Sequence, residues 1–167
     1  FPLLKRRELF SGVDQFLLYD FYTESGHVNE DVFAYSNGIG NRKGLVVYHN
    51  QFGSTSGWIN TSASYLNKNT GNLENKKLYE GLNISGDANR YIIFRDISSG
   101  MEFIRSNQEV RDKGLFFNLQ AYEHHVFVDF REVVEDGFSQ YGQLNAYLGG
   151  RGVPSIHIAL SELMLAP

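Results

Sequence analysis

The stretch VFAYSNGIGNRKGLVVYHN, residues 32–50, decides the fold of this chain. Two runs of β-branched and aromatic residues flank a loop of Asn, Gly and basic residues, which is the pattern of a β-hairpin. The glycines of the loop lack the Lys-Ser/Thr ending of a phosphate-binding loop and the strand-to-helix context of a dinucleotide fingerprint. We therefore interpret this stretch as two antiparallel strands joined by a turn.

Further short strands are expected on both sides of this hairpin. They cover residues 16–23, 57–66, 76–84, 90–100, 101–106, 115–122 and 124–133. In residues 57–66, Trp58 and Asn60 alternate with Ile59 and Thr61, as in a ribbon with two different faces. The most apolar strands, residues 115–122 and 124–133, are predicted to form the centre of the sheet.

Helices are expected at the two ends of the chain. Residues 1–12 place Pro2 at a first helical position and end at Gly12, and residues 107–114 read as a helical turn. Residues 140–148 and 155–165 carry Leu and Ala at helical spacing. We predict one mainly β domain over residues 1–167: a short N-terminal helix (1–12), an antiparallel β-sandwich or barrel-like sheet (16–134) and a helical appendage of two short helices (138–167).

Composition excludes several classes of protein. The 167 residues are 42% hydrophobic and carry a net charge of −4, typical of a soluble globular chain without the basic stripe of nucleic-acid binders. The absence of Cys excludes disulfides and zinc-thiolate sites, and no apolar run reaches the roughly 20 residues of a membrane span. We favour a cytoplasmic location. Because the chain opens on Phe1-Pro2, we expect it to be a piece of a longer polypeptide.

The motifs of common active sites are missing. His124 and His125 are adjacent, so in a strand they point to opposite faces and cannot share a metal ion. Asp96, Asp129 and Glu132 lie beside Arg95 or Arg131 and are expected to form surface ion pairs. We therefore predict no catalytic residue, no metal site and no cofactor in this chain.

Two stretches resemble a known family. DVFAYSNGIGNRKGLVVYHN (31–50) and LQAYEHHVFVDF (119–130) resemble strands of the C-terminal β-domain of the alpha-amylase family of glycoside hydrolases. FPLLKRRELFSGVDQFLLYDF (1–21) resembles the end of the last helix of that family's (β/α)8 barrel and the lead into the β-domain. The likeness covers residues 1–134, and the two C-terminal helices depart from the common pattern. The family's catalytic Asp, Glu and Asp motifs belong to the barrel and are not found here.

The resemblance implies a non-catalytic domain of an enzyme that acts on α-glucans or related oligosaccharides. Such a domain packs against the catalytic barrel of the same polypeptide and stabilises it. We expect the apolar side chains of the N-terminal helix, Leu3, Leu4, Leu9 and Phe10, to form the docking surface. An isolated fragment would expose this surface and is expected to form a homodimer through it.

An independent carbohydrate-binding β-sandwich is the alternative from a different class. In such a module an exposed aromatic ring stacks on the apolar face of a sugar. Trp58, Tyr48 and Tyr65 are the candidates for contacts with a glycan, although packing within the strands is the favoured explanation for each, because aromatic residues are common in strands whether or not a ligand binds. A small enzyme with an unfamiliar site also stays open.

Overall fold

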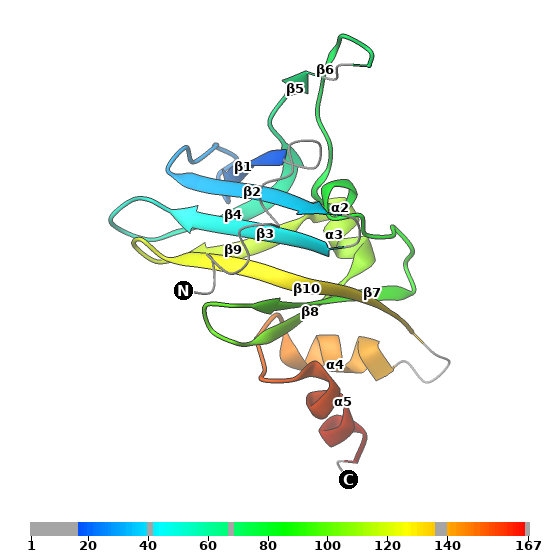
Figure 1. Ribbon diagram of the computed structural model, residues 1–167. Coiled ribbons are helices and arrows are strands. Elements are labelled where there is room, and N and C mark those ends of the chain that lie inside the picture. The colour runs from blue at the N-terminus through cyan, green and yellow to red at the C-terminus, as the bar shows by residue number, and fades with distance from the viewer. Residues whose placement is uncertain (1–16, 40–41, 67–68, 136–139, 166–167) are drawn as a thin grey trace.

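One curled antiparallel sheet of eight strands forms the body of the molecule (Figure 1). The structure is a computed structural model and describes residues 17–39, 42–66, 69–135 and 140–165. In the sheet the strands follow the order β8-β7-β10-β3-β2-β1-β4-β9. The strands are β1 (Leu17–Thr23), β2 (Val32–Ile39), β3 (Arg42–His49), β4 (Thr55–Ser62), β7 (Arg90–Asp96), β8 (Glu102–Ser106), β9 (Leu115–Leu119) and β10 (His124–Val134).

The expected hairpin of residues 32–50 lies inside this sheet. It consists of β2 and β3, paired from Val32↔His49 to Ile39↔Arg42. Ala34, Leu45 and Val47 are buried on one face of the hairpin. Leu45 and Val47 share this face because side chains two residues apart point to the same side of a strand, and Ala34 is the direct partner of Val47. The curled sheet confirms the prediction of a mainly β fold with an antiparallel β-sandwich or barrel-like sheet.

The main apolar core combines buried residues of the sheet and of two short helices. It combines strand residues such as Phe21, Ile59 and Phe127 with Leu78 of α2 (Leu78–Gly81) and Val110 of α3 (Asn107–Lys113). Ser106 caps α3 by accepting a hydrogen bond from the Glu109 N–H (3.0 Å). Figure 1 shows α2 and α3 close together at one end of the sheet.

A second apolar cluster attaches the C-terminal helices to the sheet. The helices α4 (Gln140–Leu148) and α5 (Ile156–Leu165) confirm the two helices expected there. They lie against β7 and β8 (Figure 1). The buried residues of this cluster are Ile93, Ile104, Leu144, Leu148 and Ile156.

Carboxylates from the sheet cap both helices. Glu135 accepts hydrogen bonds from the Tyr141 and Gly142 N–H groups of α4, at 3.2 and 2.8 Å. Glu102 of β8 accepts one from the Ile156 N–H of α5, at 2.8 Å. The first N–H groups of a helix have no partner within it, and negative charge is favoured at that end. Each cap therefore fixes the point at which its helix meets the sheet.

Three expectations about individual strands were wrong. Residues 115–122 were predicted at the centre of the sheet, but β9 is an edge strand that pairs only with β4. Residues 76–84 contain the short helix α2 rather than a strand. The alternation over 57–66 breaks where Tyr19↔Ser62 is followed by Phe21↔Ile59, so β4 bulges and Ser62 is buried.

Beyond β4 the chain leaves the main sheet. The strands β5 (Tyr65–Leu66) and β6 (Leu73–Glu74) pair with each other as a separate antiparallel two-stranded sheet, which projects from the body in Figure 1. The helix expected over residues 1–12 lies outside the described residues.

Candidate functional site

A cavity opens between the two edge strands of the curled sheet. Because β8 and β9 end the strand order, the sheet leaves a seam between them. The cavity in this seam has a volume of about 730 Å³ and is lined by residues of both edge strands and of β4, β7 and β10. We call it the seam pocket. Its volume lies within the roughly 300–1,000 Å³ of small-molecule sites.

Aromatic rings form the apolar wall of the seam pocket. Trp58 and Phe116 are direct partners in the β4–β9 ladder, and their rings meet edge to face at 5.2 Å. Phe127 lies 6.2 Å from Phe103 and 5.5 Å from Phe117. Phe116 is 36% exposed, whereas Phe127 is only 3% exposed. The wall therefore combines buried rings with rings at the surface.

Arg105 of β8 brings a positive charge to the same pocket. Its guanidinium lies over the ring of Phe103, at 5.7 Å from the centroid, and donates to the carbonyl groups of Ile104 (2.9 Å) and Gly150 (3.3 Å). Burial lowers its pKa, and the nearby Glu109 acts in the opposite direction. Among the described residues no carboxylate lies within ion-pair distance of it.

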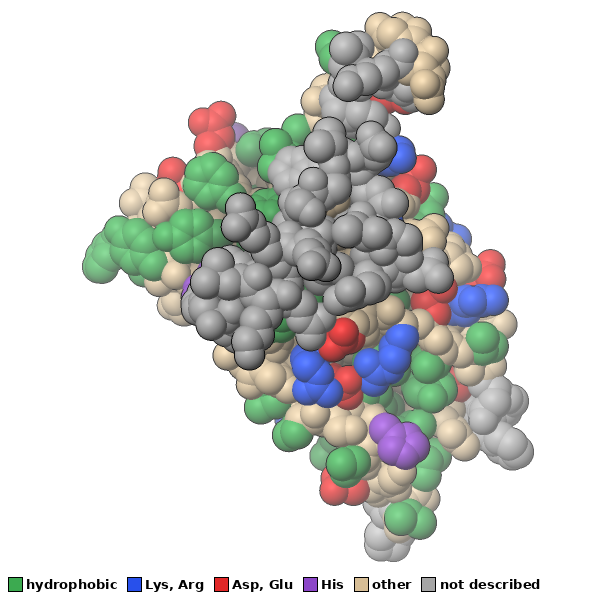
Figure 2. Space-filling view, viewed as in Figure 1, with side chains coloured by type: hydrophobic (Ala, Val, Ile, Leu, Met, Phe, Trp, Pro, Cys, Tyr) green, Lys and Arg blue, Asp and Glu red, His purple; other side chains and the backbone are tan. Residues whose placement is uncertain are grey.

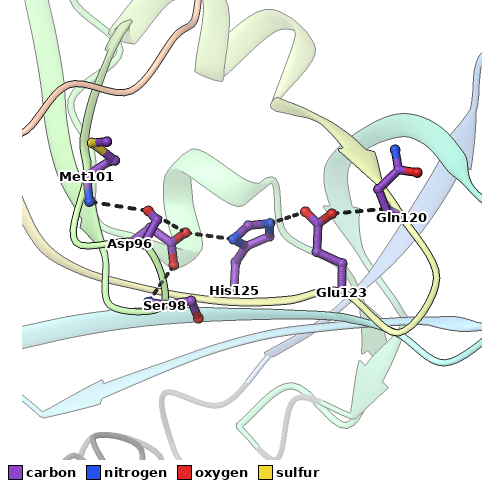
Figure 3. A network of polar contacts seen from close by, with 7 residues as sticks. Asp96, Ser98, Met101, Gln120, Glu123 and His125 are labelled. Atoms are coloured by element: carbon purple, nitrogen blue, oxygen red, sulfur yellow. Dashed lines mark hydrogen bonds and ion pairs between the residues drawn. The ribbon is translucent and has the colours of Figure 1, made fainter.

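A chain of polar contacts (Figure 3) includes His125 and Glu123, which line the pocket. The His125 Nδ1 atom lies 2.7 Å from the Asp96 carboxylate, and its Nε2 atom lies 2.5 Å from that of Glu123. Asp96 is buried and also accepts from the Ser98 N–H (3.1 Å), while Glu123 accepts from the Gln120 N–H (3.1 Å). His125 thus connects the last residue of β7 with the turn before β10.

The protonation of this chain follows from its contacts. Carboxylates only accept hydrogen bonds, so both contacts are hydrogen bonds only when both nitrogens of His125 carry a proton. Burial by itself lowers the His125 pKa, but the bonds to Asp96 and Glu123 outweigh burial and hold the pKa above 6.5. Burial raises the Asp96 pKa, yet the bonds from His125, Ser98 and Ser99 keep it below 3.8.

These contacts leave His125 without a free nitrogen to act as a general base. A general base needs a free nitrogen or oxygen aimed at a substrate, whereas both nitrogens of His125 are engaged. Within the described part of the chain no group of three His, Asp or Glu side chains is placed to hold a metal ion.

The structure separates the three aromatic residues proposed to contact a glycan. Trp58 lines the seam pocket. Tyr48 does not line it; it is half-buried in β3 between Phe33 and His124, and its hydroxyl donates to Asn50 at 3.4 Å. Tyr65 pairs with Glu74 in the separate β5–β6 hairpin, and its side chain is outside what the structure describes. The proposed docking residues Leu3, Leu4, Leu9 and Phe10 also lie outside the described residues.

Sequence reasoning missed the chain around His125. His124 and His125 do point to opposite faces, with His124 exposed and His125 half-buried, as expected. Asp96 was interpreted as a surface ion-pair residue, which is wrong, because its side chain is 1% exposed and bonded to His125. The two residues are far apart in sequence, so only the β7–β10 pairing brings them together.

None of the helices in the described residues is long and apolar enough to cross a membrane. Comparisons of this chain with protein-family models, with curated proteins and with solved structures found no match.

Proposed function

We propose that this chain is the non-catalytic C-terminal β-domain of a glycoside hydrolase of the alpha-amylase family. In this role it packs against the catalytic (β/α)8 barrel of the same polypeptide and stabilises it. The parent enzyme acts on α-glucans or related oligosaccharides.

The observation that carries the proposal is the position in the sheet of the two segments whose sequences resemble strands of that family's C-terminal β-domain. Residues 31–50 contain β2 and β3, and residues 119–130 lead into and fill most of β10. β10 pairs with β3 through His124↔Tyr48 to Phe127↔Leu45, so the three strands are neighbours. Two segments that are distant in sequence therefore form one continuous part of the sheet, as expected if they derive from one domain type.

Exposed apolar side chains on the C-terminal helices support a packing role. Tyr147, Ile158 and Leu165 are 65%, 57% and 83% exposed, and hydrophobic side chains are visible at this end of the molecule in Figure 2. Exposed apolar area costs about 25 cal/mol per Å² relative to burial. Contact with a neighbouring domain that covered these side chains would therefore be stabilised by their burial.

Truncation of the parent enzyme tests the proposal. Removal of residues 17–134 should lower the unfolding midpoint of the barrel while leaving its KM for short maltooligosaccharides unchanged. Removal of residues 140–165 alone takes away the exposed apolar side chains of the two helices but leaves the strands in place, so it should lower the midpoint by a smaller amount. The isolated chain should not hydrolyse starch.

Two results would overturn the proposal. One is hydrolysis by the isolated chain that a single carboxylate substitution abolishes. The other is a reading frame that encodes no barrel with the family's Asp, Glu and Asp motifs before Phe1.

A carbohydrate-binding module is the second candidate function. Trp58, one of its three proposed contacts, lines the seam pocket beside Phe116 and polar side chains, and this observation favours it. The two functions can coexist, since the pocket and the exposed side chains of Tyr147, Ile158 and Leu165 involve different residues.

A further inference from the structure

Building on the carbohydrate-binding candidate, on which it rests, we propose that the seam pocket binds a neutral saccharide. The aromatic wall packs against the apolar face of a sugar ring, and Glu123 accepts a hydrogen bond from a sugar hydroxyl. The proposal thus names the ligand class of the site and the residue that recognises its hydroxyl groups.

The charges in the pocket select a neutral ligand. Glu109, Glu123, Arg105 and His125 line the pocket. The two contacts of His125 with carboxylates are hydrogen bonds only when both of its nitrogens carry protons, and in that state the pocket holds two negative and two positive side chains. An anion would meet the two carboxylates, and a cation would meet the guanidinium and the imidazolium. Like charges in a partly buried site are repulsive, so a ligand without net charge is favoured.

The polar groups still available in the pocket select a ligand rich in hydroxyl groups. A carboxylate has about four acceptor sites, and the described contacts of Glu123 use two, for Gln120 and His125. Arg105 has five N–H donors, of which two are engaged with described carbonyl groups. A hydroxyl group both donates and accepts, so it can satisfy both side chains, whereas a purely apolar ligand would leave them without water or partner.

The aromatic wall supplies the complementary apolar surface. Phe116 is 36% exposed and is the most accessible ring that lines the pocket, and the ring of Trp58 contacts it edge to face. Sugar rings carry C–H groups on one face and hydroxyl groups around the rim, which matches a ring surface bordered by Glu123 and Asn118.

Fluorescence of the full chain provides a direct test, because Trp58 is its single tryptophan. The probes are maltotriose and cellotriose as neutral ligands, trigalacturonate as the anion and the glucosamine trisaccharide as the cation. We expect titration calorimetry and Trp58 fluorescence to show binding of a neutral trisaccharide, about tenfold tighter than either charged one.

Matched variants locate the site. Phe116→Ala and Glu123→Gln should each weaken binding about tenfold. Phe52→Ala, at an 82% exposed ring outside the pocket, and Glu30→Gln, at an exposed carboxylate, should leave the affinity unchanged. Asn118→Ala, at an exposed position on the rim, provides a further pocket variant if Phe116→Ala fails to fold.

The possible failures are distinguishable. No binding of either neutral trisaccharide would overturn both the saccharide site and the carbohydrate-binding candidate, while the packing role would stand. Binding that favours a charged trisaccharide, or that the pocket variants leave unchanged, would overturn the site assignment alone.

Discussion

Replacement of Glu102 tests how the sheet holds the last helix. The side chain is 5% exposed, and its carboxylate bonds to Arg131 (2.9 Å) and Arg95 (3.2 Å) in addition to capping Ile156 (2.8 Å). Glu102→Gln preserves an oxygen that can accept from Ile156 but removes the charge that faces the two guanidinium groups. Glu102→Ala removes the acceptor as well.

The magnitudes follow from the exposure of the partners. Arg95 and Arg131 are 36% and 46% exposed, so water can replace part of their lost contacts. We expect Glu102→Gln to cost about 1–2 kcal/mol of the free energy of unfolding, from weakened charged hydrogen bonds. Glu102→Ala should cost about 2–4 kcal/mol, since the buried Ile156 N–H also loses its partner.

Urea unfolding measures these differences, and hydrogen exchange of the Ile156 amide locates them. Glu162→Gln, an exposed change on the same helix, is the control and should stay within about 0.5 kcal/mol of the wild type. The role of the carboxylate would be refuted if the free energy of unfolding of Glu102→Gln equalled that of this control. It would also be refuted if the Ile156 amide exchanged at the wild-type rate in Glu102→Ala.

The pH dependence provides an independent check. Burial raises the Glu102 pKa, but the Ile156 N–H, Arg131 and Arg95 outweigh burial and hold it below 4.5. A carboxyl group whose pKa is lower in the folded state stabilises the fold at pH values above its unfolded-state pKa. This contribution is lost as the pH falls through the folded-state pKa. The difference between wild type and Glu102→Gln should therefore shrink in acid. A constant difference from neutral pH to well below 4.5 would contradict this linkage.

Three further predictions concern the sheet. Because the His125 pKa is raised in the folded state, the stability that His125 contributes is complete below pH 6.5 and is lost as the pH rises through the folded-state pKa. The thermal midpoint of the wild type should therefore fall over this pH range, and that of His125→Asn should not show this fall. Phe127→Ala should cost about 3–5 kcal/mol in urea unfolding, because the ring is 3% exposed in the core, and a wild-type midpoint would show that the strand is misplaced. Gly57→Ala should cost about 3 kcal/mol in the same assay, since the new Cβ would lie 2.1 Å from the Tyr22 carbonyl oxygen; unchanged stability would contradict this close approach.

Local patterns were sufficient to predict most strands and both C-terminal helices. The hairpin over residues 32–50 could be predicted because its turn and its alternation lie within a few residues of each other. The edge position of β9 could not be predicted from the sequence. An apolar run has the same pattern whether the second face of its strand is covered by a helix, by a neighbouring strand or by part of a pocket. In β9, Leu115 and Leu119 are buried in the core, while Phe116 faces the seam pocket.

The candidate site was only partly predictable for a related reason. Trp58 was identified because an exposed aromatic ring can stack on the face of a sugar, whereas Arg105 and Glu123 have no local pattern that sets them apart. Their significance comes from pairing between distant segments, such as β7 with β10 and β4 with β9. No window along the sequence contains that information.

The seam also has a consequence for the order of folding. Hairpins such as β2–β3 and β7–β8 join neighbouring segments, but β3–β10 and β4–β9 join segments that are far apart in the chain. Loops that close over longer distances lose more chain entropy, so the distant pairings are expected late in folding. Since β9 and β10 form two of its walls, the pocket is expected to exist only after these last strands have docked, and in refolding experiments the environment of Trp58 should become native after the β2–β3 amides are protected from exchange.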